Sequence, residues 1–150
     1  MPKLKPSLAF DDPTRGPLFS LRFVLSLVLM IVGIAWIAFY YAVVRPGDDG
    51  KAGGPDFLAD LAGWNYLIGF VLFFLGLTLA AHRSTPLGRG RGVVVGMLGC
   101  FLVGLVWICV FYVFSNDLSP LWVMNDLGQK NLIVGIAFMA VGFAYATKWE

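Results

Sequence analysis

The chain has 150 residues, of which 59% are hydrophobic and only 13% are charged; its formal net charge is +2 and its mean hydropathy is +0.80. In soluble globular domains roughly a quarter of the residues are charged, so this composition excludes an ordinary soluble domain. Helices buried inside a soluble protein would also leave almost no polar faces for water. We therefore predict an all-α integral membrane protein.

Four apolar runs hold the excess of hydrophobic residues, and none of them contains Asp, Glu, Lys or Arg. A helix of about 20 residues, with a range of about 17 to 25, crosses the hydrocarbon core of a bilayer and satisfies its own backbone hydrogen bonds there. The fourth run is only just long enough. We predict four transmembrane helices, at residues 23–44, 64–81, 93–114 and 131–147.

The segment before the first run, residues 1–22, mixes four prolines with charged side chains, so we expect a flexible cytoplasmic tail. Its basic residues are also typical of the start of a signal peptide. However, the apolar run that follows is longer than a signal core, and no Ala-x-Ala-like cleavage site closes it. We expect this run to remain as a membrane anchor.

The first loop, residues 45–54, begins with proline and glycine and is too glycine-rich to fold alone. Residues 55–61 are expected to form a short helix on the membrane surface, with Asp56 as its N-cap and Gly63 at its end. The second span then begins with Trp64-Asn65-Tyr66. Its two aromatic rings suit the membrane–water boundary, and its asparagine is expected to cap the helix or to bond a neighbouring group.

Basic residues divide unequally among the hydrophilic segments. The two alternate loops carry only Arg45, Lys51 and Lys130, and the remaining eight are Lys3, Lys5, Arg15, Arg22, Arg83, Arg89, Arg91 and Lys148. The positive-inside rule therefore places both termini and the linker at 84–92 in the cytoplasm, in a multi-pass protein of the plasma membrane. Because arginines beside a bilayer are ordinary topology signals, we expect no binding to nucleic acid.

An internal repeat organises the whole chain. The stretch 60–69 recurs in degenerate form at 126–135, and Gly33-Ile34-Ala35-Trp36-Ile37 aligns with Gly104-Leu105-Val106-Trp107-Ile108. We predict a tandem duplication with two helical hairpins in parallel-repeat orientation, related by an axis along the membrane normal. Helices in lipid associate through small residues, so the candidate packing positions are Gly33, Trp36, Gly69, Gly76, Gly104, Trp107, Gly135 and Gly142.

The sequence offers little for catalysis. Cys100 and Cys109 lie nine residues apart in one helix, on opposite sides of it, and cannot pair with each other. With His82 as the single histidine, no metal site is expected, and we predict no catalytic residue and no cofactor. Two alternatives stay open. A small transporter or channel would require a polar or charged route through the spans, which is not visible, and a membrane enzyme or maturation factor would show turnover.

The repeat motif carries a resemblance to a known family. The residues that carry it are Met1-Pro2-Lys3, Gly33-x-x-Trp36, and Leu61-x-x-Trp64-Asn65-Tyr66 followed by Gly76. They resemble CrgA, the small septation regulators of actinobacterial cell division, which are typically one hairpin with a cytoplasmic N-terminal tail. The resemblance covers residues 23–83 well and 93–149 more loosely. It therefore implies two hairpin domains, at 23–83 and 93–150, joined by the linker.

The resemblance implies a non-enzymatic component of the divisome, enriched at the septum, that regulates septum formation. Its implied partners are membrane division proteins, including the septal peptidoglycan synthase and other Fts proteins, together with FtsZ and the lipid bilayer. Self-association is also implied, although two hairpins in one chain are able to replace a homodimer. In the second copy Lys130 and Leu132 replace two motif residues, so the candidate partner-binding positions are Trp64, Asn65, Tyr66 and Asn131.

Overall fold

The computed structural model describes residues 19–148, so most of the predicted tail at 1–22 lies outside the described residues. In this part of the chain every regular element is helical, which confirms the all-helical prediction. The long helices are α1 (Leu21–Phe39), which continues as a π-helical turn at Tyr40–Val44, α3 (Trp64–Ala80), α4 (Arg91–Val113) and α6 (Asn131–Ala146). The short ones are α2 (Asp56–Leu61), α5 (Trp122–Leu127) and a 3-10 turn at Gly128–Lys130.

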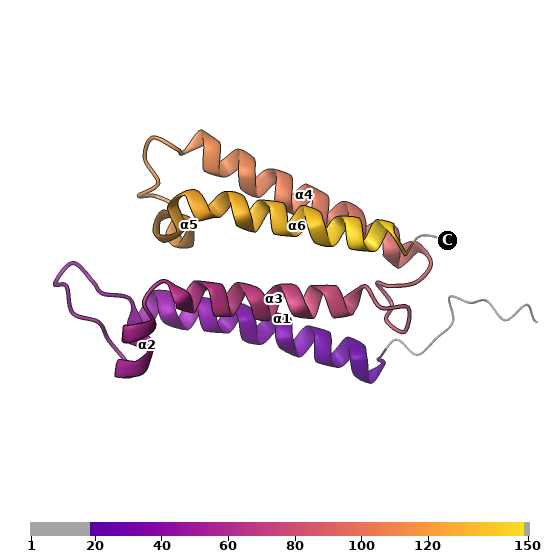
Figure 1. Cartoon of the computed structure of the whole chain (residues 1–150), viewed down its shortest axis with the longest axis horizontal. Helices are drawn as coiled ribbons and strands as arrows, with labels where there is room; N and C mark the ends of the chain where they lie inside the picture. The colour runs from indigo at the N-terminus through magenta and orange to yellow at the C-terminus, as the bar shows by residue number, and fades with distance from the viewer. Residues whose placement is uncertain (1–18, 149–150) are drawn as a thin grey trace, which may run out of the picture.

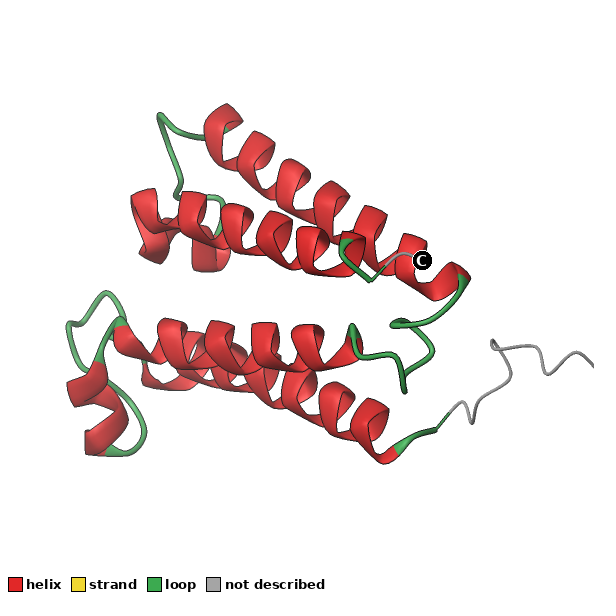
Figure 2. Cartoon of the chain, turned by 45° about the vertical axis from the view of Figure 1, so that its right-hand side comes forward, coloured by secondary structure: helices red, strands yellow, loops and turns green. Residues whose placement is uncertain are grey.

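The long helices form two hairpins, α1 with α3 and α4 with α6 (Figure 1). Helices α3 and α6 lie between α1 and α4 and run in the same direction, with both long loops at one end and the linker at the other (Figure 1). Figure 2 shows the same two hairpins from a second side, each with its short helix beside the loop end. Contacts between the hairpins are made mainly by α3 and α6.

Length and apolar composition make three helical stretches able to cross a membrane. They are Leu21–Val44, Arg91–Val113 and Trp122–Ala146, which contain 24, 23 and 25 residues. The fourth helix, α3, is equally apolar but has 17 residues, or about 26 Å at a rise of about 1.5 Å per residue. The structure thus has apolar helices at all four predicted positions. Helix α6 by itself has 16 residues, and its stretch reaches 25 only together with α5 and the 3-10 turn.

Glycines bring the two helices of each hairpin into backbone contact. A Cβ atom on Gly33 would lie 2.6 Å from the carbonyl oxygen of Gly69, and one on Gly104 would lie 2.8 Å from that of Gly135. The same pair of positions therefore makes a close backbone approach in both hairpins. Towards the linker end, a Cβ on Gly76 would lie 2.6 Å from the carbonyl oxygen of Ser26. Such spacing leaves no room for a larger side chain on either helix.

The three remaining predicted packing positions, Trp36, Trp107 and Gly142, make other kinds of contact. Gly142 packs against a side chain rather than against backbone, because a Cβ atom added to it would lie 3.2 Å from the ring of Phe101. Trp36 and Trp107 are half-buried at equivalent places in the two hairpins. The ring of Trp107 also reaches the other hairpin, because it meets Phe70 edge-on with centroids 6.1 Å apart.

Aromatic rings fill the interface between the hairpins. Phe138 of α6 packs edge-to-face against Phe73 and Phe74 of α3, with centroids 5.8 and 4.9 Å apart. Near the linker end, the fully buried Tyr145 donates a hydrogen bond from its hydroxyl to the carbonyl oxygen of Leu77, at 3.3 Å. The two hairpins are thus packed by side chains, unlike the backbone-to-backbone approach within each hairpin.

The short helix α2 forms where the sequence predicts one, but its caps differ. Asp56 was predicted as the N-cap; this is wrong, because Pro55 takes that position with an extended backbone and Asp56 is the first helical residue. An acid there still favours the helix, since it lies by the positive end of the helix dipole. The helix ends at Ala62, whose φ is 42°, and not at Gly63.

The linker between the hairpins is a compact turn. Thr85 is fully buried, and its hydroxyl donates to the carbonyl oxygens of Ala80 and His82 while accepting from the backbone N–H of Gly88 at 3.0 Å. A side-chain contact of 2.7 Å joins Arg22, at the start of α1, to a ring nitrogen of His82. These bonds tie the linker to both ends of the first hairpin.

Candidate interaction site

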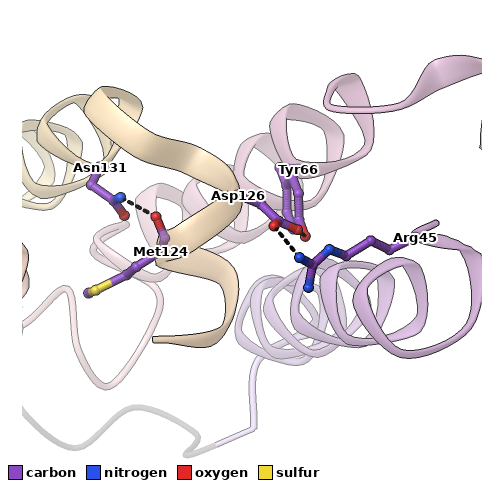
Figure 3. Close-up of polar contacts among 5 residues, drawn as sticks. All are labelled: Arg45, Tyr66, Met124, Asp126 and Asn131. Atoms are coloured by element: carbon purple, nitrogen blue, oxygen red, sulfur yellow. Dashed lines mark hydrogen bonds and ion pairs between the residues drawn. The ribbon is translucent and has the colours of Figure 1, made fainter. Parts of the chain in front are cut away.

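Each copy of the repeat motif contains a buried asparagine that fixes a short helix to the long helix that follows it. The side-chain nitrogen of Asn65 donates to the carbonyl oxygens of Leu58, at 2.7 Å, and Ala62, at 2.9 Å. Asn131 repeats this arrangement with Met124 and Gly128, seven and three residues before it, at 2.8 and 2.7 Å (Figure 3). The last carbonyls of a helix lack partners within it, so these amides supply the missing donors.

A polar contact joins the two hairpins at the loop end, and three side chains form it. The hydroxyl of Tyr66 donates to one carboxylate oxygen of Asp126 at 2.5 Å, and the guanidinium of Arg45 pairs with the other oxygen at 2.9 Å (Figure 3). We call Arg45, Tyr66 and Asp126 the interhairpin clamp. Because both of its bonds are to a charged carboxylate, they belong to the stronger class of hydrogen bond.

Aromatic rings surround the interhairpin clamp. Tyr40 meets Tyr66 edge-on, with centroids 5.0 Å apart, and Tyr41 lies under the guanidinium of Arg45, 4.9 Å from its ring centroid. Tyr41 also stacks on Trp122 of α5, at 6.3 Å. The clamp is therefore packed by residues of both hairpins, and Tyr66 itself is almost fully buried.

The clamp forms once, although the fold is duplicated. The repeat position of Tyr66 in the second copy is Leu132, which has no hydroxyl to donate. The acid of the first copy that corresponds to Asp126 is Asp60, and it is exposed. The two copies thus differ in chemistry at the same place in the fold.

Trp64 is the exposed residue of the motif. Its side chain is 66% exposed and lines an apolar groove of about 680 Å³ between α3 and α6. Its repeat equivalent, Lys130, lines the groove from the other hairpin. Three of the four predicted partner-binding residues are buried and form hydrogen bonds within the chain: Asn65, Tyr66 and Asn131. Only Trp64 among the four is exposed.

Sequence reasoning missed the short helix α5 and the roles of Arg45 and Asp126. The repeat held the signal for α5, since moving Asp56–Leu61 by the offset of 66 gives Trp122–Leu127. In the sequence, Asp126 only marks the start of the second repeat, where it aligns with Asp60, and no contact was predicted for it. Nothing in the sequence indicates that its partners are in the other hairpin.

Two hydroxyl groups inside the long helices form hydrogen bonds within their own helix. Ser26 and Thr78 donate to carbonyl oxygens of their own helices, those of Phe23 at 2.7 Å and Phe74 at 2.6 Å, as expected for hydroxyls in an apolar span. Within residues 19–148 no three His, Cys, Asp or Glu side chains come together in a way that would hold a metal ion. Cys100 is buried and Cys109 exposed, and both are free thiols.

Comparisons with known proteins agree with the duplicated architecture. The family model described as "Cell division protein CrgA" matches the chain twice, at residues 13–84 and 81–150. A cell division protein CrgA of Streptomyces avermitilis is 41% identical over 67 residues, which cover 45% of this chain and 75% of that relative. Proteins of the same name from two strains of Corynebacterium glutamicum are 41% identical over 58 residues, covering 37% of this chain and 53% of each relative.

These matches identify the repeated unit. The chain aligns with little more than half of the Corynebacterium relatives' length. No solved structure matches the chain. Because the family model accounts for almost all of the chain in two consecutive copies, this protein belongs to the CrgA family of cell division proteins, as a tandem duplication of the family's unit.

Proposed function

We propose that this protein is a non-enzymatic membrane component of the divisome that regulates septum formation by binding other division proteins. The observation that carries the proposal is the exposed Trp64, which lies on the surface although its neighbours in the motif, Asn65 and Tyr66, are buried. A cell division role follows from the family. The binding of particular partners is the further step.

The proposed arrangement in the membrane has four spans, with both termini and the linker in the cytoplasm and both long loops outside. The distribution of basic residues supports it, since the two loops hold three of the eleven. Helix α3 is short for a span, but it is apolar along its whole length and lies between α1 and α6, which are also apolar (Figure 1). In this orientation the interhairpin clamp and Trp64 lie at the outer surface.

The proposed partners are membrane-spanning division proteins, above all the septal peptidoglycan synthase and other Fts proteins, with FtsZ as a cytoplasmic partner. Trp64 supports a contact within or beside the bilayer, since it projects from the start of an apolar helix. Exposed aromatic rings are frequent hot spots of protein interfaces, because they bury a large area at a small entropic cost. We expect the protein to be enriched at the septum for this reason.

One chain supplies two CrgA units in a fixed relation. The clamp and the aromatic interface hold the hairpins together, so the duplicated chain is proposed to replace a pair of single-hairpin molecules. Only the first unit keeps the exposed tryptophan, because the second has Lys130 at that position. The two units are therefore proposed to differ in function, with partner binding assigned to the first.

Removal of the Trp64 ring tests the proposal. We expect Trp64→Ala to lower the amount of septal synthase captured per inserted molecule by roughly thirtyfold, the effect of losing about 2 kcal/mol at a hot spot. Lys130→Ala, at the equivalent position of the second unit, is the matched control and should leave capture unchanged. Capture is measured by affinity purification from crosslinked dividing cells and divided by the membrane level of each variant.

An anchoring role of Trp64 predicts a different outcome. In that case Trp64→Ala and Trp64→Phe would both change abundance or helix depth, while capture per inserted molecule stayed the same. Unchanged capture for Trp64→Ala would therefore overturn the assignment of this residue to the partner contact.

A further inference from the structure

The groove between the hairpins has walls from both copies of the repeat. Trp64, Leu67 and Val71 line it from α3, and Lys130, Ile133 and Ala137 line it from the second hairpin. Each residue of the first set corresponds to one of the second at the repeat offset of 66. The groove thus exists only where two family units stand side by side, and a single hairpin has half of it.

The dimensions of the groove suit lipid chains better than a helix. Its lining runs along α3 from Trp64 to Phe74, about 15 Å at a rise of about 1.5 Å per residue, which is half of a hydrocarbon core of about 30 Å. A volume of about 680 Å³ over that length gives a cross-section of about 45 Å². A helix with a diameter of about 10 Å has a cross-section of about 80 Å² and is too wide to be enclosed by the groove.

Charge is placed at one end of this groove. Lys130 lies at the loop end with its side chain exposed, and within residues 19–148 it takes part in no ion pair. Of the other two basic residues at this end of the hairpins, Arg45 is already paired with Asp126, and Lys51 lies in the first long loop and is not among the residues that line the groove. Deeper in, the lining consists of apolar side chains such as Leu67, Phe74 and Ala137. An apolar channel with a cation at its head matches a molecule with an anionic head and a hydrocarbon tail.

We propose that the groove binds an anionic phospholipid, with its acyl chains between α3 and α6 and its phosphate beside Lys130. The position of Trp64, which lines the groove at the start of α3, suits this ligand, because an indole ring lies favourably at the level of the headgroups. The inference needs only that the apolar helices lie in a bilayer. Lipid binding does not depend on the division partners. If Trp64→Ala left capture of the septal synthase unchanged, the lipid proposal would not be affected.

Retention of lipid by the whole purified chain tests this proposal. The protein is extracted from bilayers containing equal amounts of phosphatidylglycerol and phosphatidylcholine, and the bound lipid is identified by native mass spectrometry. We expect one phosphatidylglycerol to be retained in preference to phosphatidylcholine. Lys130→Gln should reduce that preference roughly fivefold, the usual worth of one basic residue near an anionic headgroup. Lys51→Gln, in the other long loop, is the matched control and should not change it.

A second pair of variants tests the groove itself. Ala137→Phe places a ring among the lining residues and should abolish retention, whereas Ala140→Phe places the same ring at an exposed position of α6 outside the groove. Helical content, measured by circular dichroism, must match the wild type in both. Equal retention by the two variants, equal retention of both lipids, or no retained lipid in the folded wild type would each overturn the proposal. So would displacement of phosphatidylglycerol by a lower concentration of a polyprenyl phosphate, which would assign the groove to that lipid instead.

Discussion

The interhairpin clamp should contribute measurably to the stability of the folded chain, and Tyr66→Phe isolates one of its bonds. This substitution removes the hydroxyl that donates to Asp126 at 2.5 Å but keeps the ring that packs on Tyr40. The side chain of Asp126 is 17% exposed, so water replaces the lost donor only in part. A hydrogen bond to a charged group is worth about 1.5 to 3 kcal/mol, and we expect a loss of about 2 kcal/mol in the free energy of unfolding.

The change is measured by titrating the protein in mild detergent with sodium dodecyl sulfate and following helical content. The matched control is Tyr112→Phe, because Tyr112 is 59% exposed and lies outside the clamp; it should leave the unfolding free energy within about 0.5 kcal/mol of wild type. A double-mutant cycle with Asp126→Asn separates the pairwise bond from general effects. An unfolding free energy for Tyr66→Phe that equals that of the control would refute a stabilising clamp.

Two further predictions concern topology and helix packing. In a cysteine-free background, a single cysteine at Lys51 should react with an impermeant reagent added to intact cells and one at Ser84 should not; labelling of Ser84 from outside would contradict the two-hairpin arrangement. Gly76→Leu should lower the Tm in detergent, by an amount corresponding to about 1 to 3 kcal/mol, because a Cβ there would lie 2.6 Å from the backbone oxygen of Ser26. Gly99→Leu is its control, since a Cβ on Gly99 meets no atom within 4 Å, and equal Tm values for the two variants would show that Gly76 faces lipid.

Much of the architecture follows from the sequence, because length and apolar content alone decide whether a helix is able to cross a membrane. The bounds of α3 and α6 lie within one residue of the predicted runs. The repeat predicts that the two halves fold alike, and the paired glycines Gly33 with Gly69 and Gly104 with Gly135 make equivalent contacts. The resemblance to CrgA, based on a few motif residues, is confirmed by the family matches.

The roles of the motif residues depend on tertiary structure. Trp64 and Tyr66 are two positions apart and were predicted to act together at the membrane surface, yet one is 66% exposed and the other 3%. Helical geometry turns their side chains about 200° apart, and in an almost wholly apolar helix no polar stripe indicates which side meets a neighbour.

Long-range contacts decide that question. Tyr66 is buried because Asp126, 60 residues away, accepts its hydrogen bond from the other hairpin, and the same carboxylate holds Arg45. The groove beside Trp64 likewise requires walls from two hairpins. Apolar length, which is a local property of the chain, determines the helices of this protein. The pairing of α3 with α6 depends on side chains far apart in sequence, so only the folded molecule decides which residues are left to meet a partner.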